Sequence, residues 1–221
     1  FAIWDSQEQS LFLSRDRFGI KPLYYFYDGK CFAFASEMKA FLQLPWFSWD
    51  FEPSMVARAI SDMDSVESTE ECLIKGIKRL KAGHSLLLQK NNLPIIKRWW
   101  ITLEHLREPP STFEAQVEQF RTLFFDACRL RLRSDVPVGT ALSGGLDSSS
   151  VLRTLIYLDQ QELLGEHRQS NHWQHAFIAT FPGTVQDERA YAEQVLHNTS
   201  VVSVYKEIHL PEVLACLEES L

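Results

Sequence analysis

The residues with the clearest chemical potential form one short polar run, Ser143-Gly-Gly-Leu-Asp-Ser-Ser149. The run follows an apolar stretch and precedes a helical pattern, and a helix N-terminus offers unpaired amides and a partial positive charge to an anion. Glycines let a backbone adopt unusual angles and approach a phosphate closely, and hydroxyls donate hydrogen bonds to phosphate oxygens. The run therefore predicts a phosphate-binding loop.

Asp147 adds a metal to this prediction. A carboxylate repels a phosphate unless a cation lies between them, and Mg²⁺ prefers oxygen ligands. The run is neither a Walker loop, since no Gly-Lys-Ser/Thr follows, nor a Gly-x-Gly-x-x-Gly loop. The competing interpretation is an ordinary glycine-rich turn in which Asp or Ser caps the helix. The complete string between a strand and a helix favours binding.

The elements that position this run alternate between strands and helices. Strands are expected at 136–142, 176–181 and 201–209, and helices at 148–164 and 187–197. This alternation predicts an α/β domain, a parallel sheet with helices on its faces. Ligands of such sheets bind at the carboxyl ends of the strands, where the polar run lies.

The first hundred residues instead predict an α+β domain with a mostly antiparallel sheet. Asp28-Gly29 between two aromatic runs is a hairpin signal. A short helix is expected at 38–42, a helix at 51–60 and a loop at 61–71. The expected strands are 1–4, 11–13, 23–27, 31–35, 77–80, 85–89 and 95–99.

A break in the pattern separates the two parts. Pro109-Pro110 excludes helix, and Ser111-x-x-Glu114 fits a capping box that opens a helix. Apolar residues then recur at helical spacing: Phe113, Val117, Phe120, Phe124 and Leu130. We place the boundary near residues 104–111, with domains at 1–105 and 111–221.

The composition limits which classes of partner the protein is expected to bind and which cellular compartment it is expected to occupy. The 221 residues carry a formal net charge of −7, which disfavours nucleic acid, and no apolar run is long enough to span a membrane. The four cysteines have no zinc-type or redox-type spacing, so free thiols in a reducing, cytoplasmic setting are expected. His167, His172 and His175 are interpreted as a surface loop rather than a metal site. The chain starts at Phe1 within an expected strand, which predicts a parent protein that extends beyond both ends.

Two groups of motifs carry a family resemblance. Ser143 to Ser148 resembles the loop of the N-type ATP pyrophosphatases, and the longer stretch from Arg131 to Ser149 resembles their asparagine synthetase branch. Arg15-Asp-Arg-Phe-Gly-Ile-Lys-Pro-Leu-Tyr-Tyr25 and Ala35-Ser-Glu-Met-Lys-Ala40 resemble class II glutamine amidotransferase domains. Gly83-His84 and Arg98-Trp-Trp100 match the way that domain closes in asparagine synthetases. Taken alone, Arg15 to Tyr25 is equally a charged turn between strands.

The resemblance implies an Ntn-type antiparallel domain followed by an adenine nucleotide α-hydrolase-like domain, both partial. It implies that glutamine supplies ammonia and that Mg-ATP adenylates aspartate, with β-aspartyl-AMP as intermediate and pyrophosphate as product. A homodimer is compatible with it. Asp147 would bind Mg²⁺, and Leu142 and Ala179, which ordinary strand packing explains equally well, would contact adenosine through their backbones. The implied ATP- and pyrophosphate-binding residues are Leu142, Ser143, Gly144, Gly145, Asp147, Ser148, Ser149 and Ala179.

One departure and several alternatives accompany the resemblance. The family's glutaminase uses an N-terminal cysteine as nucleophile, whereas position 1 is Phe and Cys31 lies in an expected strand. We therefore assign no catalytic residue to this sequence and expect the nucleophile outside it. Asp187-Glu188 is interpreted as a helix cap, with a site role as the alternative. The alternative functions are a β-lactam synthetase, a lasso-peptide cyclase, a lone or tRNA-thiolating pyrophosphatase, and a non-catalytic nucleotide-binding relative.

Overall fold

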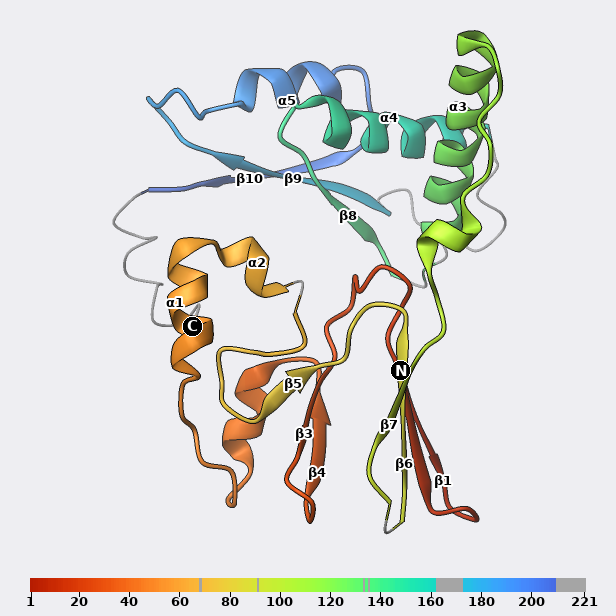
Figure 1. Ribbon diagram of the computed structural model, residues 1–221. Coiled ribbons are helices and arrows are strands. Elements are labelled where there is room, and N and C mark those ends of the chain that lie inside the picture. The colour runs from red at the N-terminus through yellow and green to blue at the C-terminus, as the bar shows by residue number, and fades with distance from the viewer. Residues whose placement is uncertain (68, 91, 133, 135, 162–172, 210–221) are drawn as a thin grey trace. The chain divides into compact units, whose positions relative to one another are not determined.

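The computed structural model describes residues 1–67, 69–90, 92–132, 134, 136–161 and 173–209. The chain divides into two compact units, residues 1–108 and residues 109–221 (Figure 1). None of the helices in these described ranges is both long enough and apolar enough to cross a membrane.

The first unit contains two antiparallel sheets rather than the single sheet expected. Arg15 follows the strand that ends at residue 14, and its side chain donates hydrogen bonds to carbonyls of its own loop and to the carbonyl of Leu80. These bonds stabilise a loop in which the chain leaves the first sheet before the next strand begins. One sheet has the order β1-β2-β6-β7 and the other β4-β3-β5. The strands are β1 (Ala2–Asp5), β2 (Ser10–Ser14), β3 (Tyr24–Tyr27), β4 (Phe32–Ala35), β5 (Ile77–Arg79), β6 (His84–Gln89) and β7 (Ile95–Arg98).

Short helices complete this unit. Met38–Gln43 forms a 3₁₀ helix, η1, and a second 3₁₀ helix, η2, covers Thr102–His105. Helix α1 (Pro53–Ser61) begins at a proline, whose missing N–H costs nothing there. The expectation of a loop over 61–71 is wrong in part, because α2 (Met63–Glu67) lies within it. The Asp62 carboxylate accepts the Ser65 amide and so helps to start this short helix.

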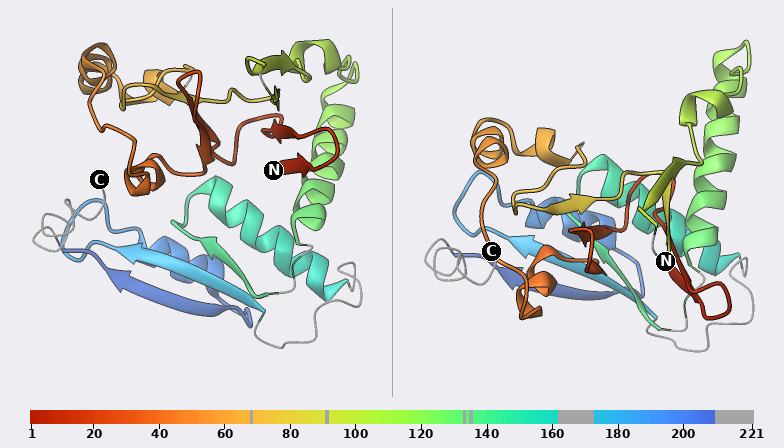
Figure 2. Two further views of the ribbon diagram at one scale, coloured as in Figure 1. Left: turned by 90° about the horizontal axis from the view of Figure 1, so that it is seen from below. Right: turned by 60° about the horizontal axis from the view of Figure 1, so that its bottom comes forward.

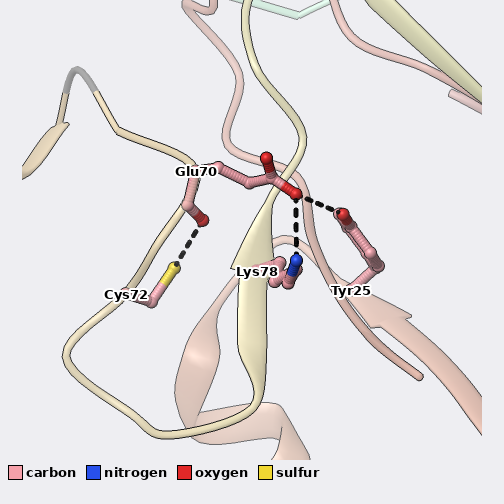
Figure 3. Close-up of polar contacts among 4 residues, drawn as sticks. All are labelled: Tyr25, Glu70, Cys72 and Lys78. Carbon is pink, nitrogen blue, oxygen red and sulfur yellow. Dashed lines mark hydrogen bonds and ion pairs between the residues drawn. The ribbon is translucent and has the colours of Figure 1, made fainter. Parts of the chain in front are cut away.

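A polar cluster links the β4-β3-β5 sheet to Glu70, in the segment that precedes β5 (Figure 3). The hydroxyl of buried Tyr25 donates to Glu70 Oε1 at 2.8 Å, and Lys78 Nζ lies 3.4 Å from the same oxygen. Desolvation opposes ionisation of Glu70, but the bond from Tyr25 and the charge of Lys78 outweigh it, so its pKa lies below the ordinary 4.5. Burial raises the pKa of the neighbouring Cys72 thiol to about 11.

The second unit is built on a parallel sheet of order β10-β9-β8. Helices α4 and α5 both cover the same face of this sheet, whereas helices were expected on its faces (Figures 1 and 2). Each new strand is added on the same side, so right-handed crossovers place both helices together. The elements are β8 (Val138–Ala141), α4 (Leu146–Gln160), β9 (Gln174–Thr180), α5 (Arg189–Leu196) and β10 (Val202–Glu207).

Strand β9 distinguishes the two faces by alternation. Ala176 and Ile178 are buried against Leu152 of α4 and Ala192 of α5, whereas Phe177 is 51% exposed on the opposite face. A strand presents successive side chains to opposite faces. The open face therefore carries apolar groups that none of the described helices of this unit covers.

Helix α3 (Phe113–Arg131) opens the second unit, and its cap differs from the expected one. Thr112, not Ser111, is the N-cap, and its hydroxyl accepts the Ala115 amide at 3.3 Å. The predicted capping box is therefore wrong by one residue. Near its end the helix buries Cys128 against Trp173. The apolar residues Phe113, Val117 and Phe120 at its start remain exposed.

Candidate functional site

The candidate loop lies where β8 ends and α4 begins, and its serines bond the loop to itself. The hydroxyls of Ser143 and Ser148 are 3.1 Å apart. Ser148 Oγ accepts the Ser143 amide at 3.3 Å, and Ser143 Oγ accepts the Gly145 amide at 3.2 Å. These bonds join residues at the two ends of the loop.

The two glycines of the loop have different roles. Gly144 has φ +82°, and a Cβ there would lie 2.5 Å from Tyr191 Cβ and 2.7 Å from the Ala192 amide nitrogen. The backbone of α5 thus packs directly on Gly144. Gly145 has φ −67° and ψ 164°, which any residue adopts, and its Cβ would meet only Ser143 Oγ at 3.2 Å. Unusual backbone angles, expected of both glycines, are needed only at Gly144.

The start of α4 is open to an anion. The first amides of a helix have no intrahelical partner, and no side chain caps this helix. Leu146 is 82% exposed, so the helix end faces solvent. Ser149 Oγ is buried and has no hydrogen-bond partner among the described residues. Open amides and an unpaired hydroxyl suit phosphate oxygens.

Asp147 stands exposed in the first turn of α4. Among the described residues, no group of three or more His, Cys, Asp or Glu side chains could hold a metal ion. Mg²⁺ commonly takes one or two carboxylates and completes its shell with water and substrate phosphates. Asp147 alone does not form a metal site, and its binding of Mg²⁺ together with a bound phosphate stays a prediction.

A cavity of about 510 Å³ lies beside the loop, at the carboxyl ends of the strands. It brings Leu142, Ser143 and Ala179 together, although Ser143 and Ala179 are 36 positions apart in the chain. The remaining lining is mainly apolar and includes Phe177, Phe181 and Ile208. Apolar walls beside a phosphate-type loop suit a nucleotide base.

The backbone of Ala179 faces this cavity for a topological reason. Leu142 donates its amide to the Phe177 carbonyl, and Ile208 donates to the Thr180 carbonyl. Backbone groups of alternate residues in a strand point to opposite neighbours, so Ala179 points, like Phe177, toward β8. Strand β8 ends at Ala141. The Ala179 N–H and C=O therefore lie beyond the end of β8, available to a ligand.

Other polar residues reach the cavity from α5 and β10. Glu188 and Gln186 line it, whereas Asp187 accepts the Arg189 amide and so acts at the start of α5. Lys206, which sequence reasoning missed, also lines it and pairs in register with Ala179. The register in which the two strands pair would have identified Lys206, and the sequence alone does not give that register. His175 lies in β9 rather than in a surface loop, and His167 and His172 lie outside the described residues.

The charged motif of the first unit is used to fold its own loop. The Arg15 guanidinium donates to the carbonyls of Lys21, Leu80 and Gly19 at 2.7–3.0 Å. Asp16 accepts the amides of Phe18, Ile20 and Lys21. Burial opposes ionisation of Asp16, but these amides outweigh it and hold its pKa below the ordinary 3.8. The motif residues therefore build the loop itself.

Comparisons with known proteins agree on both units. Residues 1–100 match the glutamine amidotransferase domain family, and residues 119–220 match the asparagine synthase family. The two matches follow each other in the order that the motifs of the sequence indicate.

Individual relatives are similar over most of this chain. Asparagine synthetase [glutamine-hydrolyzing] 3 of Bacillus subtilis is 37% identical over 154 residues, 68% of this chain and 24% of the relative. Asparagine synthetase [glutamine-hydrolyzing] 2 of the same organism is 32% identical over 190 residues, 78% of this chain and 25% of the relative. Amidase chry2 of Gibberella zeae is 33% identical over 165 residues, 73% and 23% respectively. The chain thus spans about a quarter of the length of these relatives.

Proposed function

We propose, on the premise that this chain belongs to the glutamine-hydrolysing asparagine synthetase family, that it is part of an ATP-dependent ligase that makes asparagine from aspartate with ammonia from glutamine. The observation that carries the proposal is the Ser143–Ser149 loop. It presents open helix amides beside an apolar cavity at the carboxyl edge of a parallel sheet.

The chemistry requires activation of a carboxylate, which is a poor electrophile. Transfer of AMP from ATP to the side-chain carboxylate of aspartate gives β-aspartyl-AMP and releases pyrophosphate. Ammonia then attacks the activated carbonyl carbon and the amide C–N bond forms. AMP leaves with the electrons of the C–O bond that breaks, and the nitrogen releases one proton. A loop that stabilises the departing pyrophosphate lowers the barrier of the first step electrostatically.

Each part of the site has a role in this step. The amides at the start of α4 and the Ser149 hydroxyl would donate to pyrophosphate oxygens, and Asp147 would hold Mg²⁺ against them. Bound Mg²⁺ would neutralise the charge that develops on the leaving group. The backbones of Leu142 and Ala179 would orient the adenosine moiety in the cavity.

The acceptor carboxylate is the least constrained part of the proposal. The fungal relative is named an amidase, so chains of this type occur in proteins with other names. A related synthetase that activates a different carboxylate would keep the same loop and the same pyrophosphate release. The nucleophile that releases ammonia from glutamine is not among the residues we assign.

The test is an assay of the longer protein that contains this chain, with aspartate, Mg-ATP and either glutamine or ammonia. We expect both asparagine and pyrophosphate, with pyrophosphate formation reduced at least about 100-fold by Asp147→Asn, the order lost with one electrostatic transition-state contact. Asp159→Asn, an exposed carboxylate further along α4, is the matched control and should retain activity.

Three outcomes separate the alternatives. Pyrophosphate that appears only with another carboxylate would keep the chemistry and reject aspartate as substrate. Equal activity of Asp147→Asn and Asp159→Asn would reject the metal role of Asp147. No cleavage of ATP to pyrophosphate under any of these conditions would reject the ligase and leave a non-catalytic relative.

A further inference from the structure

The first unit contains a hollow whose charged lining residues are all cationic. It has a volume of about 470 Å³ and lies between the end of β2, the connection from β5 to β6, and the end of β7. Its principal lining residues are Arg15, Phe18, Arg79, Lys81, His84 and Arg98. None of its lining residues is Asp or Glu, although the chain as a whole carries a formal net charge of −7.

The guanidinium groups are held in place by carbonyl oxygens. Arg79 is only 6% exposed, and its Nη1 donates to the carbonyls of Val66 and Thr69. Arg98 Nε donates to the Trp100 carbonyl at 3.0 Å. Carbonyls are neutral, so these bonds position the cations while their charge persists. Fixed donors that need no reorganisation favour binding of an anion.

Three of the four cations in the lining, Arg79, Lys81 and Arg98, form no ion pair with another described side chain. The carboxylate to consider is Glu70. Desolvation raises its pKa, the hydrogen bond from Tyr25 and the charge of Lys78 lower it, and Lys81 lowers it by a smaller amount. That carboxylate is already bonded to Tyr25 and Lys78.

We propose that this hollow binds a small phosphate-bearing anion, such as inorganic phosphate, pyrophosphate or the phosphates of a nucleotide. Four cationic residues line a space of about 470 Å³, and a phosphate group accepts several charge-assisted hydrogen bonds at once. Lys81 is exposed and adds the fourth cationic residue to this lining. This site is separate from the Ser143–Ser149 loop, and the inference does not depend on the proposed function.

The test is a titration of the 221-residue chain with inorganic phosphate and, separately, with pyrophosphate, followed by amide NMR. The amides of Gly83 and His84 report this hollow, and those of Gly144 and Gly145 report the loop of the second unit. We expect saturable shifts at Gly83 and His84 that weaken as the salt concentration rises. Phosphate and pyrophosphate as separate probes distinguish a single-phosphate site from one that needs two.

Lys81→Glu should weaken the response at Gly83 and His84 by about tenfold or more, because it removes one cation and adds an anion. Lys97→Glu is the matched control with the same charge change. Lys97 precedes Arg98 on β7, so strand alternation directs its side chain to the opposite face. The Lys97→Glu variant should bind both anions as the parent chain does. Arg98→Gln provides a second variant if Lys81→Glu disturbs the unit, which the remaining amide signals of β6 would reveal.

The proposal fails if Gly83 and His84 do not respond to either anion. It also fails if Lys81→Glu and Lys97→Glu weaken the response equally, since that indicates general charge rather than a site. Responses confined to Gly144 and Gly145 would place phosphate binding only in the second unit and overturn this inference while supporting the loop.

Discussion

The two adjacent glycines of the loop offer the sharpest test of the structure. We consider Gly144→Ala with Gly145→Ala as its matched control, since the same methyl group is added one residue away. At Gly144 the new Cβ would lie 2.5 Å from Tyr191 Cβ and 2.7 Å from the Ala192 nitrogen, at φ +82°. At Gly145 it would meet only Ser143 Oγ, at 3.2 Å.

The expected magnitudes follow from these contacts. A non-glycine residue in the left-handed region costs about 1–2 kcal/mol, and forcing an extra methyl group against packed backbone costs about 1–3 kcal/mol more. Gly144→Ala should therefore destabilise the second unit by about 2–5 kcal/mol, a large part of the roughly 5–15 kcal/mol that holds a domain folded. Gly145→Ala should change stability by less than about 1 kcal/mol, since its φ of −67° suits alanine.

The assay is urea unfolding of the 221-residue chain, with hydrogen exchange at α5 as the local readout. For a slope of about 2 kcal/mol per molar urea, the expected cost moves the midpoint of the second unit by about 1–2.5 M in Gly144→Ala. The first unit should unfold as in the parent chain. Equal shifts for the two variants, or a larger shift for Gly145→Ala, would refute the packing of α5 on Gly144.

Three further predictions concern single contacts. Thr112→Ala should destabilise α3 by about 1 kcal/mol whereas Ser111→Ala should have little effect, as measured by urea unfolding, because only the threonine hydroxyl caps the helix. Tyr25→Phe should lower the free energy of unfolding of the first unit by about 1 kcal/mol in the same urea assay, because it removes the hydrogen bond to Glu70. Since the folded pKa of Glu70 is depressed below 4.5, the ionic part of this loss is present above that pH and disappears as the pH falls through the folded value. Alkylation of Cys72 followed by mass spectrometry should be slow at neutral pH, because burial raises its thiol pKa to about 11.

Local patterns predicted the elements well where a single short-range rule applies. Asp28-Gly29 joins β3 to β4, and all seven strands expected in the first hundred residues are present within a few residues of their expected bounds. Two of the errors occur where two rules compete over neighbouring residues. Ser111 and Thr112 both suit an N-cap, and only the start of α3 decides between them. Likewise, acidic residues that suggested a loop also suit the first turn of α2.

The sequence by itself determined the type of most elements, the two-part organisation of the motifs and the loop residues that suit a phosphate, because these depend on neighbours in the chain. Only the tertiary structure decided that Arg15 and Asp16 serve their own loop, and that Gly144 rather than Gly145 requires glycine. It also decided that Ala179 and Lys206 join Ser143 around one cavity. Those facts depend on strand order, pairing register and the approach of α5, which join residues distant in sequence through packing that local patterns do not encode.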